Sequence, residues 1–201
     1  MAIDEGVKPV PVEDEILAVI RQRWSPMSFS DQPVSDADLA KVFTAAGWAA
    51  SCYNEQPWRF LVGRQGDATY EKIMDALVEF NQVWAKTAPV LILSASKMVF
   101  STNGYPNPLG LHDTGGASAN MSLQAAALGL QTRGISDVDQ ARARRNFAIP
   151  DEFAICAAWA LGYPGGTDAL PMIYREMEKA ARTRKPLREF VFTAWERAAE
   201  I

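Results

Sequence analysis

The chain has 201 residues and a net charge of −4 at pH 7, with 48% hydrophobic and 22% charged residues. This composition is typical of a folded domain with a packed core, and the acidity disfavours nucleic acid and anionic membranes as main partners. The two cysteines, Cys52 and Cys156, lie far apart and outside any CxxC motif, so we expect neither a disulfide framework nor a metal site. The N-terminus lacks the apolar stretch of a signal peptide, and the longest apolar run, residues 88–93, is too short to cross a bilayer, so we expect a cytoplasmic protein.

Hydrophobic periodicity separates the chain into helices and strands. It predicts helices over residues 12–24, 35–50, 68–79, 113–130, 137–147 and 171–184. Apolar runs predict strands over residues 58–63, 89–96 and 153–163. Ser35 is the expected N-cap of the second helix, with Asp36 and Asp38 in the first turn, where the helix dipole favours acids. The elements do not follow a βαβ period, so the predicted class is mixed α+β.

The helix predicted over residues 113–130 consists largely of Gly, Ala and Ser. Because small side chains let backbones approach closely, we expect this helix to be central, against a sheet or a second copy of the chain. Residues 97–110 contain two prolines, two asparagines and two glycines and are predicted to form a loop. Residues 186–200 are predicted to form an amphipathic tail.

A dense run of polar groups occupies residues 51–56, between a predicted helix and a predicted strand. A loop at such a place is where a rigid scaffold usually presents groups to a ligand. Two arginine-containing segments, RWSPMSF from Arg23 and RTRKP from Arg182, suit a phosphate, because a guanidinium binds phosphate through two parallel hydrogen bonds. Each segment alone is more typical of a solvated surface. The single histidine, His112, has no serine elbow to accompany it, so a hydrolase triad is disfavoured.

Several segments together resemble the nitroreductase family of FMN-dependent flavoproteins, in family order from about residue 20 to residue 192. The segments are RWSPMSF, AASCYNEQPWRF, Asn81, HDTGGASANMSLQAAALGL, the turn at residues 133–135, LGYPG and RTRKP. The resemblance implies an α+β, nitroreductase-like fold with a central, mainly antiparallel sheet surrounded by helices. It implies one domain over residues 1–201, with an N-terminal arm at residues 1–11. It also implies an intertwined homodimer in which a tail at residues 186–201 reaches the partner subunit.

The resemblance also implies a cofactor site at the subunit interface. The cofactor-binding residues that it implies are Arg23, Trp24, Ser25, Met27, Ser51, Cys52, Asn54, Gln56, Asn81, Arg133, Gly134, Arg182 and Arg184. Arg23, Ser25, Arg182 and Arg184 would hold the FMN ribityl chain and phosphate. The loop residues Ser51, Cys52 and Asn54 would come from the other subunit.

Two positions would face the flavin ring. Asn81 matches an asparagine whose amide contacts the polar edge of the isoalloxazine. Gly134 matches a glycine whose backbone N–H lies near N5, the hydride acceptor, so it is the predicted catalytic position. Simpler interpretations also stand: Asn54 could fix a turn, Gly134 could be an ordinary turn glycine, and Cys52 is expected to line a pocket without acting as a nucleophile.

Met27 departs from the family pattern, which usually carries Arg or Lys there, near flavin N1 and O2. A protein tunes a flavin partly through charge near N1, so a cation at residue 27 is expected to raise the reduction potential. Arg133, beside Gly134, could supply some positive charge instead.

The function implied is that of an oxidoreductase. It would move a hydride from NADH or NADPH through FMN N5 to a small-molecule acceptor such as a nitroaromatic or a quinone. Three alternatives remain: a different, specialised FMN reaction, a flavin-binding protein with little NAD(P)H reductase activity, and an interaction protein without a cofactor.

Overall fold

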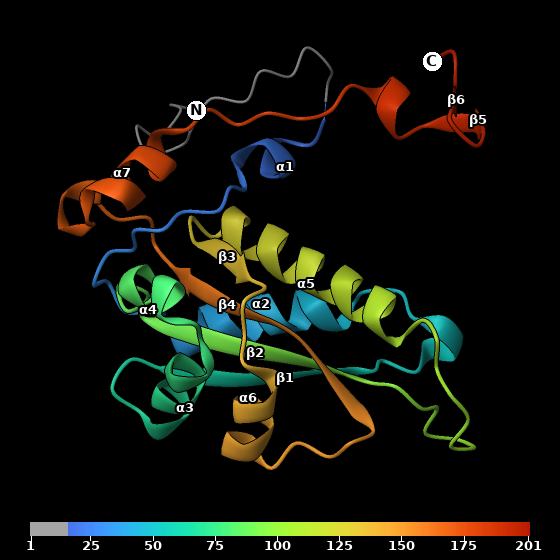
Figure 1. Ribbon diagram of the computed structural model, residues 1–201, viewed down its shortest axis with the longest axis horizontal. Helices are drawn as coiled ribbons and strands as arrows, with labels where there is room; N and C mark the ends of the chain where they lie inside the picture. Colours follow the sequence, from blue (N-terminus) through green and yellow to red (C-terminus); the bar gives the residue numbers. More distant parts are fainter. Residues whose placement is uncertain (1–15) are drawn as a thin grey trace.

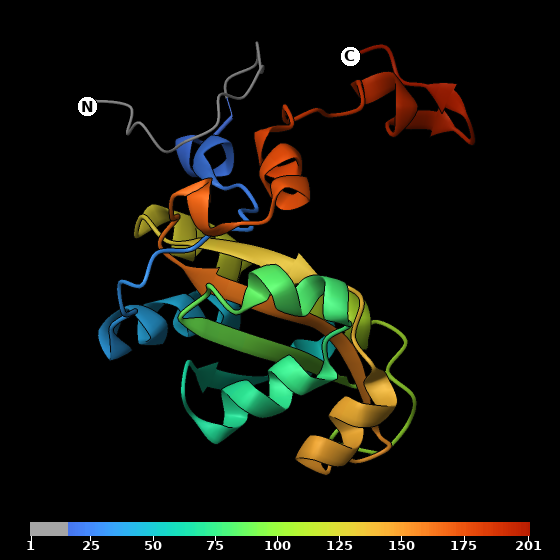
Figure 2. The ribbon, with the colours of Figure 1, turned by 60° about the vertical axis from the view of Figure 1, so that its left-hand side comes forward.

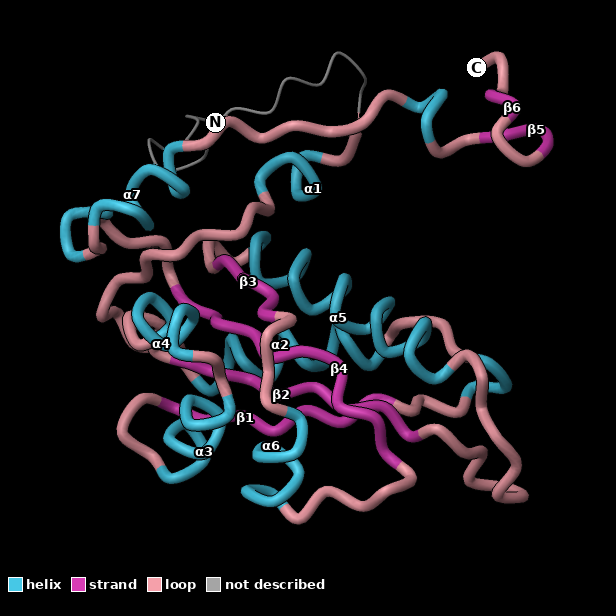
Figure 3. The backbone as a smooth tube through the Cα atoms, in the orientation of Figure 1, coloured by secondary structure: helices cyan, strands magenta, loops and turns pink. Residues whose placement is uncertain are grey.

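The computed structural model describes residues 16–201 and is built around one four-stranded sheet (Figure 1). Its strands, in spatial order, are β1 (Trp58–Arg64), β2 (Val90–Lys97), β4 (Phe153–Gly162) and β3 (Gln131–Ile135). Every neighbouring pair is antiparallel. The predicted α+β class with a mainly antiparallel central sheet is therefore confirmed. Figure 3 shows helices on both sides of the sheet.

Helices account for most of the remaining elements. The α-helices are α1 (Ala18–Gln22), α2 (Asp36–Gly47), α3 (Ala68–Ala76), α4 (Glu79–Ala85), α5 (Gly110–Ala127), α6 (Gln140–Phe147) and α7 (Met172–Lys179). The 3-10 turns are η1 (Cys52–Asn54), η2 (Thr167–Ala169) and η3 (Leu187–Glu189). Ser35 caps α2 as predicted, since its Oγ accepts the Asp38 backbone N–H at 3.0 Å. None of the helices in the described residues is long and apolar enough to cross a membrane.

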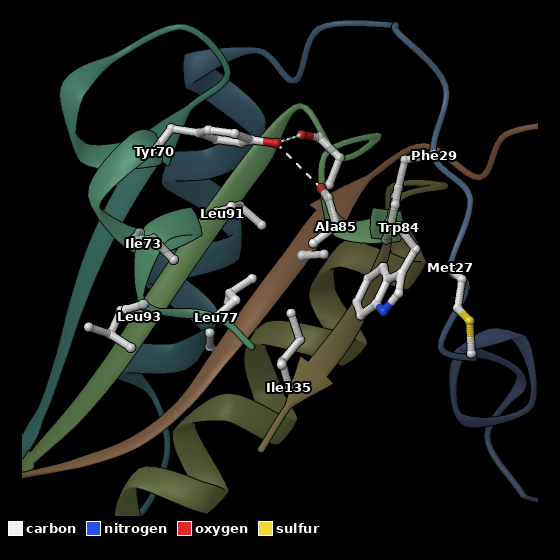
Figure 4. Close-up of a cluster of buried hydrophobic side chains, with 14 of the residues drawn as sticks. Met27, Phe29, Tyr70, Ile73, Leu77, Trp84, Ala85, Leu91, Leu93 and Ile135 are labelled. Carbon is white, nitrogen blue, oxygen red and sulfur yellow. Dashed lines mark hydrogen bonds between the residues drawn. The ribbon is translucent and has the colours of Figure 1, made fainter. Parts of the chain in front are cut away.

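Strand β2 lies between β1 and β4 at the centre of the core, and its side chains are buried on both faces of the sheet. Leu91 and Leu93 join a cluster with residues of α3, α4 and α6 (Figure 4), whereas Val90 and Ile92 join a second cluster with residues of α2 and α5. This alternation is the two-residue period of a strand. Of the two buried serines in the strand, Ser94 donates its Oγ–H to the Ala157 carbonyl at 2.8 Å, whereas Ser96 Oγ has no hydrogen-bond partner among the described residues.

Several elements differ from the sequence prediction. Residues 79–85 form α4, which was not predicted, and residues 131–135 form an edge strand where only a turn was expected. Helix α1 covers residues 18–22 of the predicted 12–24, of which residues 12–15 lie outside the described part of the chain, as does the predicted arm at residues 1–11. Helix α7 ends at residue 179, five residues before the predicted end.

The chain leaves the body of the molecule after α7. Figures 1 and 2 show an extended segment that leads away from the sheet to a small hairpin of β5 (Phe192–Ala194) and β6 (Arg197–Ala198). Its large apolar side chains are exposed, with Trp195 at 89% and Phe190 at 57%. The predicted tail is thus an arm that carries apolar groups without burying them in its own chain.

Candidate functional site

Three arginines from two distant segments meet where α1 ends and the C-terminal arm begins. The Arg182 guanidinium donates to the carbonyl oxygens of Arg21 and Arg23, each at 2.8 Å. Arg23 Nη1 donates to Ser25 Oγ at 3.2 Å. These hydrogen bonds join segments about 160 positions apart in the sequence, so the fold brings together the two arginine motifs that the sequence pattern singled out.

These arginines repel one another. Burial lowers the pKa of Arg23, and the neighbouring Arg184 lowers it further. Burial also lowers the pKa of Arg182, with further contributions from Arg23 and then Arg184. A ligand with several anionic oxygens would relieve this repulsion, and a guanidinium fork with a serine hydroxyl beside it offers the donors that a phosphate needs. The donor set therefore fits the phosphate end of FMN.

Arg133 and Gly134 lie beside this cluster on the edge strand β3. Arg133 Nη1 donates to the Ser25 carbonyl at 2.6 Å, and its guanidinium lies over the Trp84 ring at 5.2 Å from the centroid. Burial lowers the pKa of Arg133, and the Glu178 carboxylate opposes that shift. Gly134 is exposed, and a Cβ there would come within 3.1 Å of the Trp159 ring. A side chain at residue 134 would thus crowd Trp159, while glycine leaves the backbone accessible.

Asn81 connects α4 to the end of β3. Its Oδ1 accepts the Trp84 Nε1–H at 3.1 Å, and its Nδ2 donates to Asp137 Oδ2 at a long 3.5 Å. Because Asn81 is 7% exposed, this amide is largely committed to the protein. The weak Asp137 bond leaves its Nδ2 as the group that could exchange partners with a ligand; the predicted flavin contact stays a prediction.

Met27 and Trp24 are buried beside the arginine cluster. The Met27 side chain is 2% exposed and lies in the core with Trp84 and Ile135 (Figure 4). Its backbone N–H donates to Glu178 Oε2 of α7 at 2.9 Å, which fixes residue 27 beneath that helix. The Trp24 side chain is also buried, at 8%. In this structure the Trp24 and Met27 side chains are buried, whereas Ser25 between them is exposed, so the cofactor contacts predicted for residues 24 and 27 stay predictions.

The polar loop, residues 51–56, has an unusual backbone. Tyr53, Asn54 and Gln56 have φ values of 53°, 56° and 50°, in the left-handed region. Ser51 Oγ accepts the Gln56 N–H at 3.0 Å, and Asp113 Oδ2 accepts the Cys52 N–H at 2.9 Å. Strained backbone of this kind gathers at ligand-binding sites, where surrounding structure maintains it.

The loop and the arginine cluster lie at opposite ends of α5. Cys52 is bonded to Asp113 in the first turn of α5, whereas Arg133 follows the other end of the helix through β3 (Figure 1). Helix α5 has 18 residues. At 1.5 Å per residue it is about 27 Å long. A single chain therefore brings Arg23, Ser25 and Arg133 together with the C-terminal arginines, but it does not bring Ser51, Cys52, Asn54 and Gln56 to them.

Two carboxylates near the site were not predicted from the sequence. Glu178 is 5% exposed and shares the buried face of α7 with Tyr174. Residues four apart lie on the same face of a helix, so the spacing of Glu178 from the apolar Tyr174 was the sequence signal for a buried carboxylate. Asp113, the neighbour of His112 in the sequence, is the residue that contacts the loop.

Comparison with known proteins places this geometry among flavoproteins. A family model described as Nitroreductase family matches residues 20–83 and 65–163. A protein of Archaeoglobus fulgidus, provisionally named as an NADH dehydrogenase/NAD(P)H nitroreductase, is 29% identical over 155 residues, which are 75% of this chain and 86% of that protein. A crystal structure described as an oxidoreductase containing FMN is 28% identical with a TM-score of 0.86, over 96% of this chain and 97% of the other. A Desulfovibrio desulfuricans structure, provisionally assigned as a nitroreductase in complex with FMN, is 26% identical with a TM-score of 0.71, over 91% and 98%.

Proposed function

The chain belongs to the nitroreductase family, and on that premise we propose that it is an FMN-dependent oxidoreductase that carries electrons from NADH or NADPH to a small-molecule acceptor. The relatives named for nitroreductase and NAD(P)H–flavin oxidoreductase activity support the reaction class. The two similar structures that contain FMN support the cofactor. Nitroaromatics and quinones are the proposed acceptors.

The observation that carries this proposal is that the fold joins the arginines of residues 182–184 to the Arg23 and Ser25 segment. Burial and the neighbouring arginines lower the pKa of Arg23 and of Arg182, so an anion bound at the cluster would stabilise their charged forms. The oxygen atoms of the FMN phosphate would accept hydrogen bonds from Arg23, Arg184 and the Ser25 hydroxyl. Arg182 would hold the backbone at residues 21 and 23, through the two hydrogen bonds that it already makes.

The ring end of the cofactor would lie along β3. When bound, FMN supplies the redox chemistry, because its N5 can accept a hydride and pass it on. Gly134 would give the ring access to the strand backbone, since it has no side chain and is exposed. Arg133 would place a fixed positive charge beside the ring, held by Ser25 and Trp84. The protein thus positions the ring and sets the charge around it.

We also propose that the complete site is made by two copies of the chain. The loop at residues 51–56 is about one α5 length away from the arginine cluster of its own chain, but a second copy related by a two-fold axis could supply it. The exposed small residues of α5, which include Gly115, Gly116 and Ala119, would let the two copies approach closely. The apolar C-terminal arm would then be covered by the partner.

The experiment is a visible absorption spectrum of the purified protein, followed by anaerobic addition of NADH or NADPH. We expect bound flavin in the wild type and loss of its visible absorbance on reduction. The double variant Arg23→Ala/Arg184→Ala should bind FMN at least about a hundredfold more weakly, because it removes two charge-assisted contacts. Arg145→Ala, an exposed arginine in the last turn of α6, is the matched control and should bind as the wild type does.

Each other outcome identifies an alternative. A colourless protein that binds no added FMN would contradict the proposal and leave an interaction protein. Bound FMN that neither nucleotide reduces would indicate a flavin-binding protein without NAD(P)H reductase activity. Retention of FMN by the double variant at wild-type affinity would show that the arginine cluster is not the phosphate site.

A further inference from the structure

The loop at residues 51–56 adopts a backbone conformation that its sequence does not favour. Tyr53, Asn54 and Gln56 all lie in the left-handed region. That region costs a non-glycine residue on the order of 1–3 kcal/mol, and asparagine tolerates it best. The conformation therefore depends on contacts with the rest of the molecule.

Two of the hydrogen bonds at this loop give it little external support. The bond from the Gln56 N–H to Ser51 Oγ, at 3.0 Å, connects two residues of the loop itself. The bond from the Ser101 N–H to Glu55 Oε1, at 2.8 Å, connects it to an exposed residue of the loop at residues 98–109. Neither bond ties the loop to a helix or a strand, and the end of the loop is held by Arg59 of β1, whose Nη1 donates to the Gln56 carbonyl at 3.1 Å.

Asp113 supplies a connection to a rigid element. Its Oδ2 accepts the Cys52 N–H at 2.9 Å, and its Oδ1 lies 3.2 Å from His112 Nδ1. Asp113 is 4% exposed, whereas the His112 side chain is 83% exposed. Asp113 lies in the first turn of α5, where the helix dipole favours a carboxylate, and α5 contributes Ala117, Met121 and Ala125 to the core. The carboxylate is thus a fixed acceptor at the start of the strained segment.

We propose that Asp113 is a positioning residue for the cofactor site: by binding the Cys52 amide, it holds the polar loop in the conformation that receives FMN from the partner subunit. This inference rests on the proposed function, because it assigns the loop to the flavin site. Asp113 acts through the loop backbone and needs no contact with the cofactor. The bond lies directly before Tyr53, the first left-handed residue, so its loss releases the strained segment.

The first test is hydrogen exchange of residues 53–56 in the full-length, cofactor-free protein. Asp113→Ala removes the acceptor, whereas Asp113→Asn keeps an oxygen that can accept the Cys52 N–H. We expect exchange at residues 53–56 to be about tenfold faster or more in Asp113→Ala, close to wild type in Asp113→Asn, and unchanged in β2. His112→Ala, which leaves the Cys52 bond in place, should match the wild type.

A variant on the other side of the same bond guards against misfolding of Asp113→Ala. Cys52→Pro removes the backbone N–H that donates to Asp113. The backbone permits a proline at residue 52, because Ser51 has φ −146° and ψ 153°, the extended conformation favoured before a proline. Residue 52 is also the first residue of η1, a position where proline is tolerated. Cys52→Pro should speed exchange as Asp113→Ala does, while Cys52→Ser, which keeps the N–H, should not.

The second test is FMN affinity of the same variants. Asp113→Ala and Cys52→Pro should bind FMN about tenfold more weakly or worse, and Asp113→Asn should restore most of the affinity. Unchanged exchange in both Asp113→Ala and Cys52→Pro would overturn the proposal, as would faster exchange without any loss of FMN affinity. If the wild type binds no FMN, the proposed function fails, and hydrogen exchange still decides whether Asp113 holds the loop.

Discussion

At the level of single residues, two arginines and one glutamate make hydrogen bonds with residues 23–27. Arg23 and Arg133 present guanidinium groups to Ser25, one to its hydroxyl and one to its carbonyl. Glu178 lies on the inner side, accepts the Met27 N–H and counteracts the effect of burial on the pKa of Arg133. The Glu178 side chain is 5% exposed, whereas Arg23 and Arg133 are half-buried. Arg133, rather than residue 27, is therefore the cation available to the flavin ring in the proposed site.

Substitution of Met27 tests this assignment. Met27→Arg places a charge into a core position that is 2% exposed. We expect the free energy of unfolding to fall by about 3–5 kcal/mol, as it does for an uncompensated buried charge. Met27→Leu should cost less than about 1.5 kcal/mol, because it conserves volume and polarity.

The measurement is urea unfolding of the cofactor-free protein. If Met27→Arg unfolds at the same urea concentration as Met27→Leu, the side chain at residue 27 is not held in the core. A cation at residue 27 could then lie near the flavin and raise its reduction potential.

At the scale of elements, close backbone approach and one buried hydroxyl fix α3 against the sheet. A Cβ at Gly63 of β1 would lie 2.2 Å from the Tyr70 backbone nitrogen, so only glycine permits this contact. The Tyr70 hydroxyl donates to the Ala88 carbonyl at 3.0 Å, just before β2. Burial raises the pKa of Tyr70 to about 12, from the ordinary value of 10.0.

This shift predicts how stability depends on pH. Because the folded-state pKa is raised, the contribution of Tyr70 is fully present below pH 10 and is lost as the pH rises toward about 12. Burial also raises the pKa of Cys156 to about 11, from 9.0, and acts in the same direction, so Cys156→Ala is the proper background. In that background, unfolding free energies measured by urea from pH 9 to 12 should fall less steeply for Tyr70→Phe than for Tyr70. Equal slopes of unfolding free energy against pH in the two proteins would contradict a raised pKa of the Tyr70 hydroxyl.

Elements with a strong local pattern could be predicted, and those that depend on tertiary pairing could not. The Ser35 cap and the small-residue run of α5 are local signals, as is the apolar run of β2, and all three were found. Strand β3 has the sequence QTRGI, with a glycine and two long polar side chains, and it is a strand because it pairs with β4. Helix α4 has only seven residues, too few for a clear period.

The residues of the candidate site also divide into those that a local motif predicts and those that depend on tertiary contacts. Arginine and serine motifs identified Arg23, Ser25 and Arg182 from local chemistry, and the fold brings them together. The burial of Met27 beneath α7 depends on a contact between residues 151 positions apart, which no local pattern reveals. The left-handed residues of the loop were likewise hidden, since only Asn54 is of a type that favours that region.

At the scale of the whole molecule, the distance along α5 decides how the site is assembled. The polar loop lies at one end of this helix and the arginine cluster beyond the other, while the C-terminal arm leaves the body next to the cluster (Figures 1 and 2). Two copies related by a two-fold axis would pair each cluster with the partner's loop and give the exposed Phe190 and Trp195 a surface to cover. In this arrangement each complete FMN site requires two chains.

Complementation between two defective chains tests this requirement most directly. One chain carries Arg23→Ala/Arg184→Ala and the other carries Asn54→Ala/Gln56→Ala, and each defective homodimer should bind FMN poorly. Co-expression with two different affinity tags and tandem purification isolates the mixed dimer, with a dimer of two differently tagged wild-type chains as the control. If loop and cluster come from different chains, the mixed dimer has one intact site and should bind one FMN per dimer at wild-type affinity. A mixed dimer that binds FMN as weakly as both defective homodimers would contradict the account, because it would place each site within a single chain.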